Sequence, residues 1–243
     1  MGIFRPRKPS NIGSQFKKME KLFVRYRLYL VLWLTISINC FGPTQSYPTV
    51  QQIIFTSSRF GDNMDIYTMD RDGNNQVNLT RHSGRDTEPQ FSPNGSAVMF
   101  IINRDGNDEI YYAELEWDGG YTRYRIINQV NLTNHPSWDR NPQFSPAGDK
   151  IMFESTRYGN YELYIMDTDG NNLINLTNRP GKDFIGNFAP DGNSIIFTSI
   201  NMDTGDETTD IFILDINGNN LINLSNYPDE EDWASSFQPW PLD

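Results

Sequence analysis

Apolar and polar positions alternate in short runs along residues 50–240, and glycine-containing turns separate the runs. A period of two residues over four to eight positions is typical of β-strands that bury one face. The region lacks the 3.6-residue spacing of amphipathic helices, which excludes the helical repeat families. The pattern therefore predicts an all-β domain of short antiparallel strands.

One unit of this pattern recurs at intervals of 44 to 53 residues. Its first strand ends in Phe-x-Pro, and a turn then leads to an apolar second strand that contains another Phe. A third strand preceded by an acid, a second turn and an Asn-Leu-Thr or Asn-Leu-Ser sequence complete the unit. The landmarks are Phe91, Phe144, Phe188 and Phe237 in the first strands, Phe55, Phe100, Phe153 and Phe197 in the second, and Asn78, Asn131, Asn175 and Asn223 in the fourth.

Four antiparallel strands in each unit predict the blades of a β-propeller. The array opens at a second strand, near residues 51–55, and it ends with an isolated first strand, Asp232–Pro239. Pairing this C-terminal strand with the three N-terminal strands leaves no sheet edge open. The sequence therefore predicts a propeller of four four-stranded blades over residues 50–240, closed by that pairing.

These motifs resemble the TolB-like, or PD40, β-propeller repeat, whose form is roughly D-x-x-P-x-F-S-P-D-G, I-x-F-x-S-x-R, I-Y-x-M-D-x-D-G and N-L-T. The third copy shows the form most clearly, from Phe144 to Thr177. The resemblance covers about residues 50–239 and implies that the first strands line a central channel. TolB itself has an N-terminal α/β domain and six blades, so this chain departs from it, and a role in binding Pal is not implied.

Charge is distributed unevenly along the chain. Residues 1–27 hold eight basic side chains and one acid, whereas residues 28–243 hold 12 basic and 30 acidic side chains, a net charge of −18. Such a surface repels phosphate backbones and anionic lipids, so we expect no nucleic-acid partner. The single cysteine, Cys40, excludes a disulfide within the chain.

The basic N-terminal stretch leads into an apolar segment, Leu28–Ile38. This arrangement is typical of a secretory signal, and the segment is shorter than the roughly 20 residues of a membrane span. We therefore expect residues 1–46 to be a signal peptide or anchor that directs an exported, periplasmic or extracellular protein. Cleavage, retention as an anchor over residues 28–42, lipidation at Cys40 and a start at Met19 in place of Met1 all stay open. Membrane contact is expected only through this segment.

Strand direction sorts the loops of such a propeller onto two faces. The loops between blades and those between second and third strands share one face, and they carry the most varied sequence, as functional loops on rigid scaffolds do. One acid stands five residues before each first-strand Phe, and the resemblance places these four acids at the channel mouth. They either hold calcium or another cation or hydrogen-bond the loops between blades. Aromatic residues adjoin three of them and either contact a sugar or peptide or fill space between blades. The candidate binding residues are Asp86, Asp139, Asp183, Asp232, Trp138, Phe184 and Trp233.

Two further features recur or stand out. Arg59, Arg104 and Arg157 occupy one repeat position, and we expect them to pair with the acids that precede the third strands. The second blade carries extra residues over 113–125, which predict an elongated hairpin that either docks a partner or is a surface extension.

Catalytic signatures are few. The chain has no G-x-S-x-G nucleophile motif, and His82 and His135 stand at equivalent positions of two repeats, which argues against a compact histidine metal site. We therefore predict a non-catalytic binding module for a protein, a peptide or an envelope polysaccharide, with no required cofactor and with homo-oligomerisation open. Two alternatives are a carbohydrate-active enzyme that uses a pair of loop-face carboxylates, and a structural protein that assembles through the 113–125 hairpin.

Overall fold

The computed structural model describes residues 51–59, 63–104, 106–117, 124–200, 208–226, 231–233 and 236–238. The described strands all belong to one compact unit, Tyr47–Asp243. The predicted signal or anchor over residues 1–46, with Cys40 and the span 28–42, lies outside the described residues. Within the described part of the chain, no helix has the length and apolar character that a membrane crossing requires.

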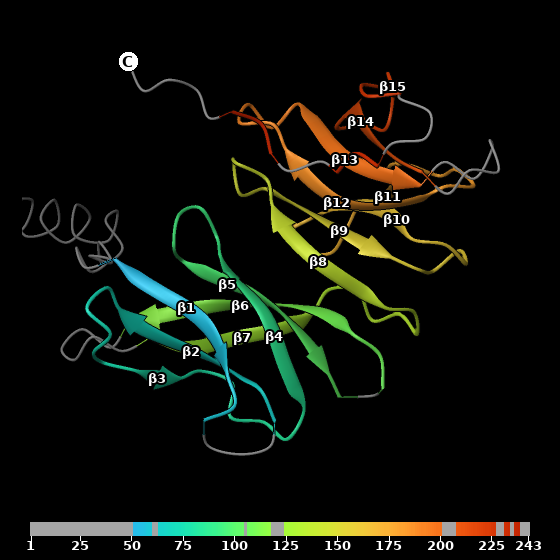
Figure 1. Cartoon of the computed structure of the whole chain (residues 1–243). Helices are drawn as coiled ribbons and strands as arrows, with labels where there is room; N and C mark the ends of the chain where they lie inside the picture. The colour runs from blue at the N-terminus through green and yellow to red at the C-terminus, as the bar shows by residue number, and fades with distance from the viewer. Residues whose placement is uncertain are drawn as a thin grey trace, which may run out of the picture. The chain divides into compact units, whose positions relative to one another are not determined.

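Fifteen described strands form four antiparallel sheets, which follow one another in chain order (Figure 1). Sheet 1 contains β1 (Gln52–Ser57), β2 (Asp65–Asp70) and β3 (Val77–Asn78). Sheet 2 contains β4 (Arg85–Phe91), β5 (Ala97–Asn103), β6 (Glu109–Trp117) and β7 (Tyr124–Asn131). Sheet 3 contains β8 (Asp139–Phe144), β9 (Lys150–Ser155), β10 (Glu162–Asp167) and β11 (Ile174–Asn175). Sheet 4 contains β12 (Lys182–Phe188), β13 (Ser194–Ile200), β14 (Thr209–Asp215) and β15 (Ile222–Asn223).

Tight turns with glycine join the first and second strands of sheets 2, 3 and 4, as the sequence predicted. Gly95, Gly148 and Gly192 have φ angles of 72°, 75° and 72°. Glycine adopts this left-handed conformation without the steric cost of a Cβ atom. These turns set the register in which each first-strand Phe faces an apolar residue of the second strand, as Phe188 faces Ile195.

The Asn-Leu-Thr motif fastens the short fourth strand to the third. In sheet 3, Asn175 donates from its side-chain amide to the carboxylate of Glu162. The Asn175 Oδ1 atom accepts from the Asn178 amide at 3.0 Å, and Thr177 Oγ1 accepts from the Leu163 amide at 3.2 Å. The other three sheets repeat the amide-to-acid bond, from Asn78 to Asp65, Asn131 to Glu109 and Asn223 to Asp210. The acid before each third strand therefore has a partner within its own sheet.

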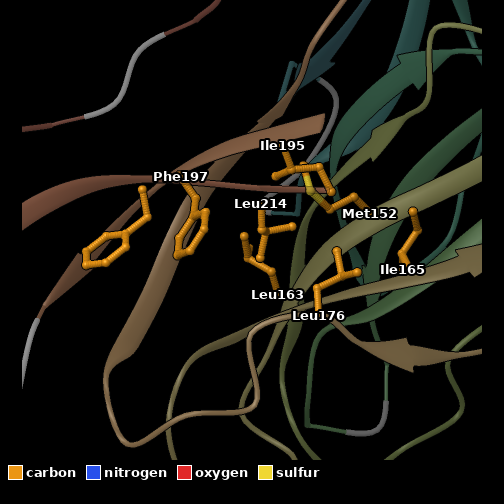
Figure 2. Close-up of a cluster of buried hydrophobic side chains, with 8 residues drawn as sticks. Met152, Leu163, Ile165, Leu176, Ile195, Phe197 and Leu214 are labelled. Carbon is orange, nitrogen blue, oxygen red and sulfur yellow. The ribbon is translucent and has the colours of Figure 1, made fainter. Parts of the chain in front are cut away.

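Consecutive sheets pack face to face and bury three apolar cores. Figure 2 shows the core between sheets 3 and 4, formed by Met152, Leu163, Ile165, Leu176, Ile195, Phe197 and Leu214, all 3% exposed or less. Burying one such side chain contributes about 1.5–3 kcal/mol. The cores arise directly from the alternation in the sequence, because each strand presents apolar residues to both neighbouring sheets.

Side-chain amides also join the first strands of neighbouring sheets. The Phe144 amide donates to Gln90 Oε1 at 2.9 Å, and the Phe188 amide donates to Gln143 Oε1 at 3.2 Å. Gln143 in turn donates to Asn187 Oδ1 at 3.0 Å. These side-chain hydrogen bonds hold the ends of β4, β8 and β12 close together.

The ring that the sequence predicted is not closed in the structure. Sheet 1 has three strands, and the described residues at 231–233 and 236–238 form no strand ladder with β1. The prediction that the C-terminal strand completes sheet 1 is therefore wrong. The segment leaves sheet 4 as the other first strands leave the preceding sheet, because the Asp232 amide donates to the Thr209 carbonyl at 2.8 Å and Phe237 lines a pocket with Phe188, yet its described residues pair with no strand. Four-stranded blades are confirmed for sheets 2, 3 and 4.

The buried core makes a first prediction about stability. Leu176 is 3% exposed, whereas Leu173, on the same outer part of sheet 3, is 44% exposed. Leu176→Ala should lower the free energy of unfolding by about 2–5 kcal/mol, because it leaves a cavity between two sheets. Leu173→Ala should change it by no more than about 0.5 kcal/mol. Urea unfolding followed by tryptophan fluorescence measures both; equal effects would contradict the packing described.

Candidate functional site

Asp86, Asp139 and Asp183 each mark a junction between two consecutive sheets, and Asp232 makes the same contact after sheet 4. In all four cases the backbone amide of the acid donates to a carbonyl at or just before the start of the repeat's third strand in the preceding sheet, at 2.8 or 2.9 Å, in the pairs Asp86 to Met64, Asp139 to Asp108, Asp183 to Tyr161 and Asp232 to Thr209. The acid that recurs in the sequence therefore makes the same backbone hydrogen bond in each copy. The loops that form the predicted binding face are fixed to one another at their bases.

The side chains of Asp86, Asp139 and Asp183 are completely buried. At the junction of sheets 2 and 3, Asp139 accepts from Arg157 Nη2 at 3.0 Å, and the Arg157 side chain is only 8% exposed. The same guanidinium lies over the rings of Phe153 and Tyr164, at 5.4 and 4.8 Å. A cation that is both paired and stacked on aromatic rings is well suited to hold a buried carboxylate.

Sheet 4 lacks an arginine at the position of Arg157, and Arg179 takes over its role from a different loop. Arg179 donates to Asp183 at 3.0 Å and to the hydroxyl of Ser199. Its guanidinium lies 4.2 Å from the centre of the Phe212 ring and 5.8 Å from that of Phe197. In the repeat, Arg179 stands where other copies have His82, His135 and Tyr227. We call this arrangement, in which an arginine pairs with the buried aspartate and stacks on two aromatic rings, the clasp. The clasp is therefore built from arginines at two different repeat positions.

This pairing corrects the expectation for the recurring arginines. We predicted that they pair with the acids before the third strands, and that prediction is wrong for Arg157, whose partner is Asp139. Those acids instead accept from the asparagines of the fourth strands. Glu162 lies five residues from Arg157 and Asp139 lies 18, so nearness along the sequence indicated the wrong partner.

The junction of sheets 1 and 2 has a weaker version of the clasp. Arg104 lies 5.7 Å from the centre of the Tyr111 ring, and no ion pair between the described residues joins it to Asp86. Burial raises the pKa of the Asp86 carboxyl above its ordinary value of 3.8, while Thr80 and Arg104 oppose the shift. Unlike Asp139 and Asp183, the buried Asp86 carboxyl therefore has no ion pair with a described residue that offsets the cost of its burial.

Three aromatic side chains stand out from the same face above these buried acids. Tyr158 is 76% exposed, Trp138 is 45% exposed and Trp233 is 52% exposed. The Trp138 carbonyl accepts from the Thr156 amide at 3.3 Å, so the loops that carry Trp138 and Tyr158 are bonded to each other. The Arg140 guanidinium lies 4.6 Å from the Trp138 ring centre, and Trp233 packs on half-buried Phe184 with ring centres 5.7 Å apart.

The predicted site residues thus divide into two layers. Asp86, Asp139 and Asp183 lie inside the junctions, whereas Trp138 and Trp233 are exposed on the loop face, with Phe184 beneath Trp233. Asp232 is half-buried. Among the described residues, no group of three or more His, Cys, Asp or Glu side chains is placed to hold a metal ion. A cation at the channel mouth stays a prediction.

The histidines serve the turns in which they stand. His82 Nδ1 accepts from the Gly84 amide at 3.1 Å, and His135 Nδ1 accepts from the Ser137 amide at 3.2 Å. Both bonds close a short turn in an inter-sheet loop. Their recurrence follows from local geometry and requires no catalytic role.

A pocket lies at the opposite end of the first strands, which the resemblance to the TolB-like repeat implies line a central channel. It has a volume of about 660 Å³ and is lined mainly by repeat-equivalent residues: Gln90, Phe91, Pro93, Gln143, Phe144, Ser145, Pro146, Asn187, Phe188, Pro190, Ser236 and Phe237. The lining is uncharged. The recurring Phe-x-Pro sequence carried the signal for it, because each copy ends a first strand at the same level.

The extension of the second blade is a longer strand pair. β6 and β7 remain paired as far as Trp117 and Tyr124, whose rings lie 5.1 Å apart. Residues 118–123 lie outside the described residues. The docking role of this hairpin stays a prediction.

A family model described as the TolB beta propeller domain matches residues 35–141 and 127–239. The chain belongs to the TolB β-propeller family. It is 29% identical over 153 residues to the TolB homolog of Chlorobaculum tepidum, which is 63% of this chain and 31% of that protein. It is 44% identical over 48 residues to the Tol-Pal system protein TolB of Bordetella pertussis, which is 20% of this chain and 10% of that protein. The chain therefore spans less than a third of either TolB relative.

Solved structures share the propeller architecture with this chain. TolB from Acinetobacter baumannii is 22% identical with a TM-score of 0.51, over 71% of this chain and 40% of that one. A puromycin hydrolase is 18% identical with a TM-score of 0.58, over 72% of this chain and 28% of that one. One fold thus serves a TolB and a hydrolase, and the likeness itself indicates no chemistry.

The buried clasp yields a second prediction. Arg157→Met leaves the buried Asp139 carboxylate without its partner and should lower the free energy of unfolding by about 3–5 kcal/mol. Adding Asp139→Asn should recover much of this loss, because the unpaired charge is removed. Arg125→Met is the matched control. Because the ion pair between Arg125 and Glu116 is exposed, this substitution should change the free energy of unfolding by no more than about 1 kcal/mol. Urea unfolding compares the variants, and a mild effect for Arg157→Met would contradict a structural role.

Asp86 gives a prediction for pH dependence. Its raised pKa means that the folded state favours the neutral carboxyl, so this group costs the fold stability as pH rises through the folded-state pKa. Asp86→Asn does not ionise. Its melting temperature should exceed that of the unchanged chain at pH 7, and the difference should shrink toward zero below the unfolded-state value of 3.8. Thermal unfolding followed by circular dichroism measures this; a difference that does not depend on pH would contradict the assignment.

Proposed function

We propose that this chain is an exported, non-catalytic binding module whose loop face contacts a protein of the cell envelope. The observation that supports it best is the exposure of Trp138, Tyr158 and Trp233 on one face, above junctions that are fixed by buried ion pairs. Trp and Tyr are enriched among the residues that dominate protein interfaces. Rigid support lowers the entropy that such side chains lose on binding.

The charge of the chain indicates the chemistry of the partner. Residues 28–243 carry a net charge of −18, so a partner segment with Lys or Arg is attracted over long range. Its cationic groups can also stack on the exposed Trp and Tyr rings. We therefore propose a basic, extended peptide segment of an envelope protein as the ligand.

The relatives support an envelope role without naming the partner. One of them is named as a TolB of the Tol-Pal system. This chain corresponds to a minor part of that protein, so its assembly partners come to this chain only as a proposal. Export, to the periplasm or the outside, belongs to the same proposal and rests on residues 1–46 of the sequence.

The carbohydrate-active alternative receives less support from the site. Glycoside hydrolysis needs two carboxyl groups about 5–10 Å apart across a shared substrate space. Asp86, Asp139 and Asp183 are instead buried at separate junctions between the sheets. Binding of a polysaccharide in the test below would therefore contradict the proposal.

Photo-crosslinking in the expressing cell tests the proposal. A benzophenone amino acid at Tyr158 should give discrete protein adducts after irradiation, because this side chain is the most exposed of the three. The same group at Leu221, which is 43% exposed on the outer part of sheet 4, is the matched control and should give none of these adducts. Trp138→Ala combined with Trp233→Ala should reduce the yield about tenfold or more.

Three outcomes would contradict the proposal. They are the absence of adducts at Tyr158, the same adducts at Leu221, or adducts that glycosidases and not proteases remove. Mass spectrometry of the adducts identifies the partner and shows whether the bound segment is basic.

A further inference from the structure

The two end sheets each expose a face that the other sheets use for packing. We call the forward face of a sheet the one that packs on the next sheet, as Met152, Leu163, Ile165 and Leu176 of sheet 3 do. The rear face packs on the preceding sheet, as Ile195, Phe197, Phe212 and Leu214 of sheet 4 do. Three described cores join forward faces to rear faces, so sheet 4 has a forward face and sheet 1 a rear face left over.

The forward face of sheet 4 is apolar, and none of the described sheets packs on it. Strand register makes Phe197 and Phe212 equivalent to Phe153 and Tyr164, which identifies the forward-face residues as Ile196, Ile211, Ile213 and Leu224. Their equivalents in sheet 3 are 1–3% exposed. In sheet 4, Leu224 is 52% exposed, the three isoleucines are half-buried, and none belongs to a described core.

The rear face of sheet 1 has the complementary composition. It holds Ile53, Phe55 and Met69, whose equivalents pack on the preceding sheet in the other three sheets. Ile53 is 39% exposed, whereas the equivalent Ile151 and Ile195 are fully buried. This face therefore matches, residue type for residue type, the surface that forward faces already bind within the chain.

Backbone pairing shows the same complementarity. Among the described strands, sheet 1 has no counterpart of the first strand of sheets 2, 3 and 4, which leaves β1 at its edge. The C-terminal segment has the sequence of a first strand, yet it forms no ladder among the described residues. The first-strand Phe pairs with Val98, Ile151 and Ile195 in sheets 2, 3 and 4, so by the same register Phe237 matches Ile53. An exposed strand edge readily accepts such a strand.

We infer that these two ends dock head to tail between copies of this chain, independently of the loop-face function. The forward face of sheet 4 and the described C-terminal residues 232–233 and 236–238 of one copy pack on the rear face of sheet 1 and on β1 of the next. The contact continues the interface that already occurs three times within the chain. A second copy supplies both surfaces, whereas the described residues of one chain form neither a core nor a strand ladder between sheets 4 and 1. A head-to-tail contact closes into a ring or extends into a filament.

Cysteine cross-linking tests the register. Two full chains are prepared in a Cys40→Ser background, one with Ile53→Cys and one with Phe237→Cys, then mixed and oxidised. Opposite residues of an antiparallel pair lie about 4.5–5.5 Å apart, within disulfide reach. We expect a mixed disulfide dimer on a non-reducing gel, on the order of tenfold more abundant than with Leu173→Cys in place of Ile53→Cys.

The double variant with both cysteines in one chain separates the outcomes. Linked species of two or more chains support the inference, and a chain linked only to itself overturns it. Phe188→Cys with Ile195→Cys is the control for oxidation, because this pair is opposed within sheet 4. Absence of the mixed dimer while this control closes also overturns the inference.

A second measurement avoids reliance on Phe237. Light scattering of the full chain should give a mass of at least twice 28.1 kDa for uncleaved protein. Leu224→Lys should raise the dissociation constant about tenfold or more, since it places a charge in an apolar contact. Leu221→Lys should not, because the equivalent Leu173 remains 44% exposed although sheet 4 covers its sheet. Circular dichroism confirms that both variants fold; a monomeric mass, or equal effects of the two variants, overturns the inference.

Discussion

The junction between consecutive sheets is the interaction on which this structure depends. Each junction combines an apolar core with a backbone bond from an aspartate amide, and at two junctions a buried Asp–Arg pair is added. The apolar core supplies most of the free energy, because burial of several large side chains outweighs any single polar contact. The ion pair adds specificity of geometry, since only one placement of the guanidinium satisfies both the carboxylate and the aromatic rings beneath it. The exposed loop face takes its shape from these junctions.

Much of the architecture could be predicted from the sequence because one pattern recurs. The glycine turns and the alternation around Phe153 and Phe197 determine strand order and register within a sheet, and the structure confirms these features in sheets 2, 3 and 4. Closure could not be predicted in the same way. Whether Phe237 reaches Ile53 depends on the angles between sheets, which the details of side-chain packing at each core determine and which a strand pattern does not encode.

The candidate site was predictable in its positions and less so in its roles. The recurrence of an acid before each first strand identified the loops correctly, yet it did not show that Asp139 and Asp183 face inward. Arg179 was missed because it performs at one junction what Arg157 performs at another, from a different repeat position. Such an exchange preserves the geometry of the clasp while it breaks the pattern in the sequence. A channel lined by the first strands was expected, but the uncharged lining of the pocket there gave no sign of a ligand or a chemistry.

Hydrogen–deuterium exchange of the full chain, measured peptide by peptide, tests most directly whether the junctions hold the loop face rigid. We expect the amides of Asp139 and Asp183, which are bonded to the preceding sheet, to exchange as slowly as those of the central strands β9 and β13. Exposed turns such as the one at Gly170 should exchange much faster. Exchange at Asp139 and Asp183 as fast as at those turns would show that the junctions open readily and would contradict a rigid loop face.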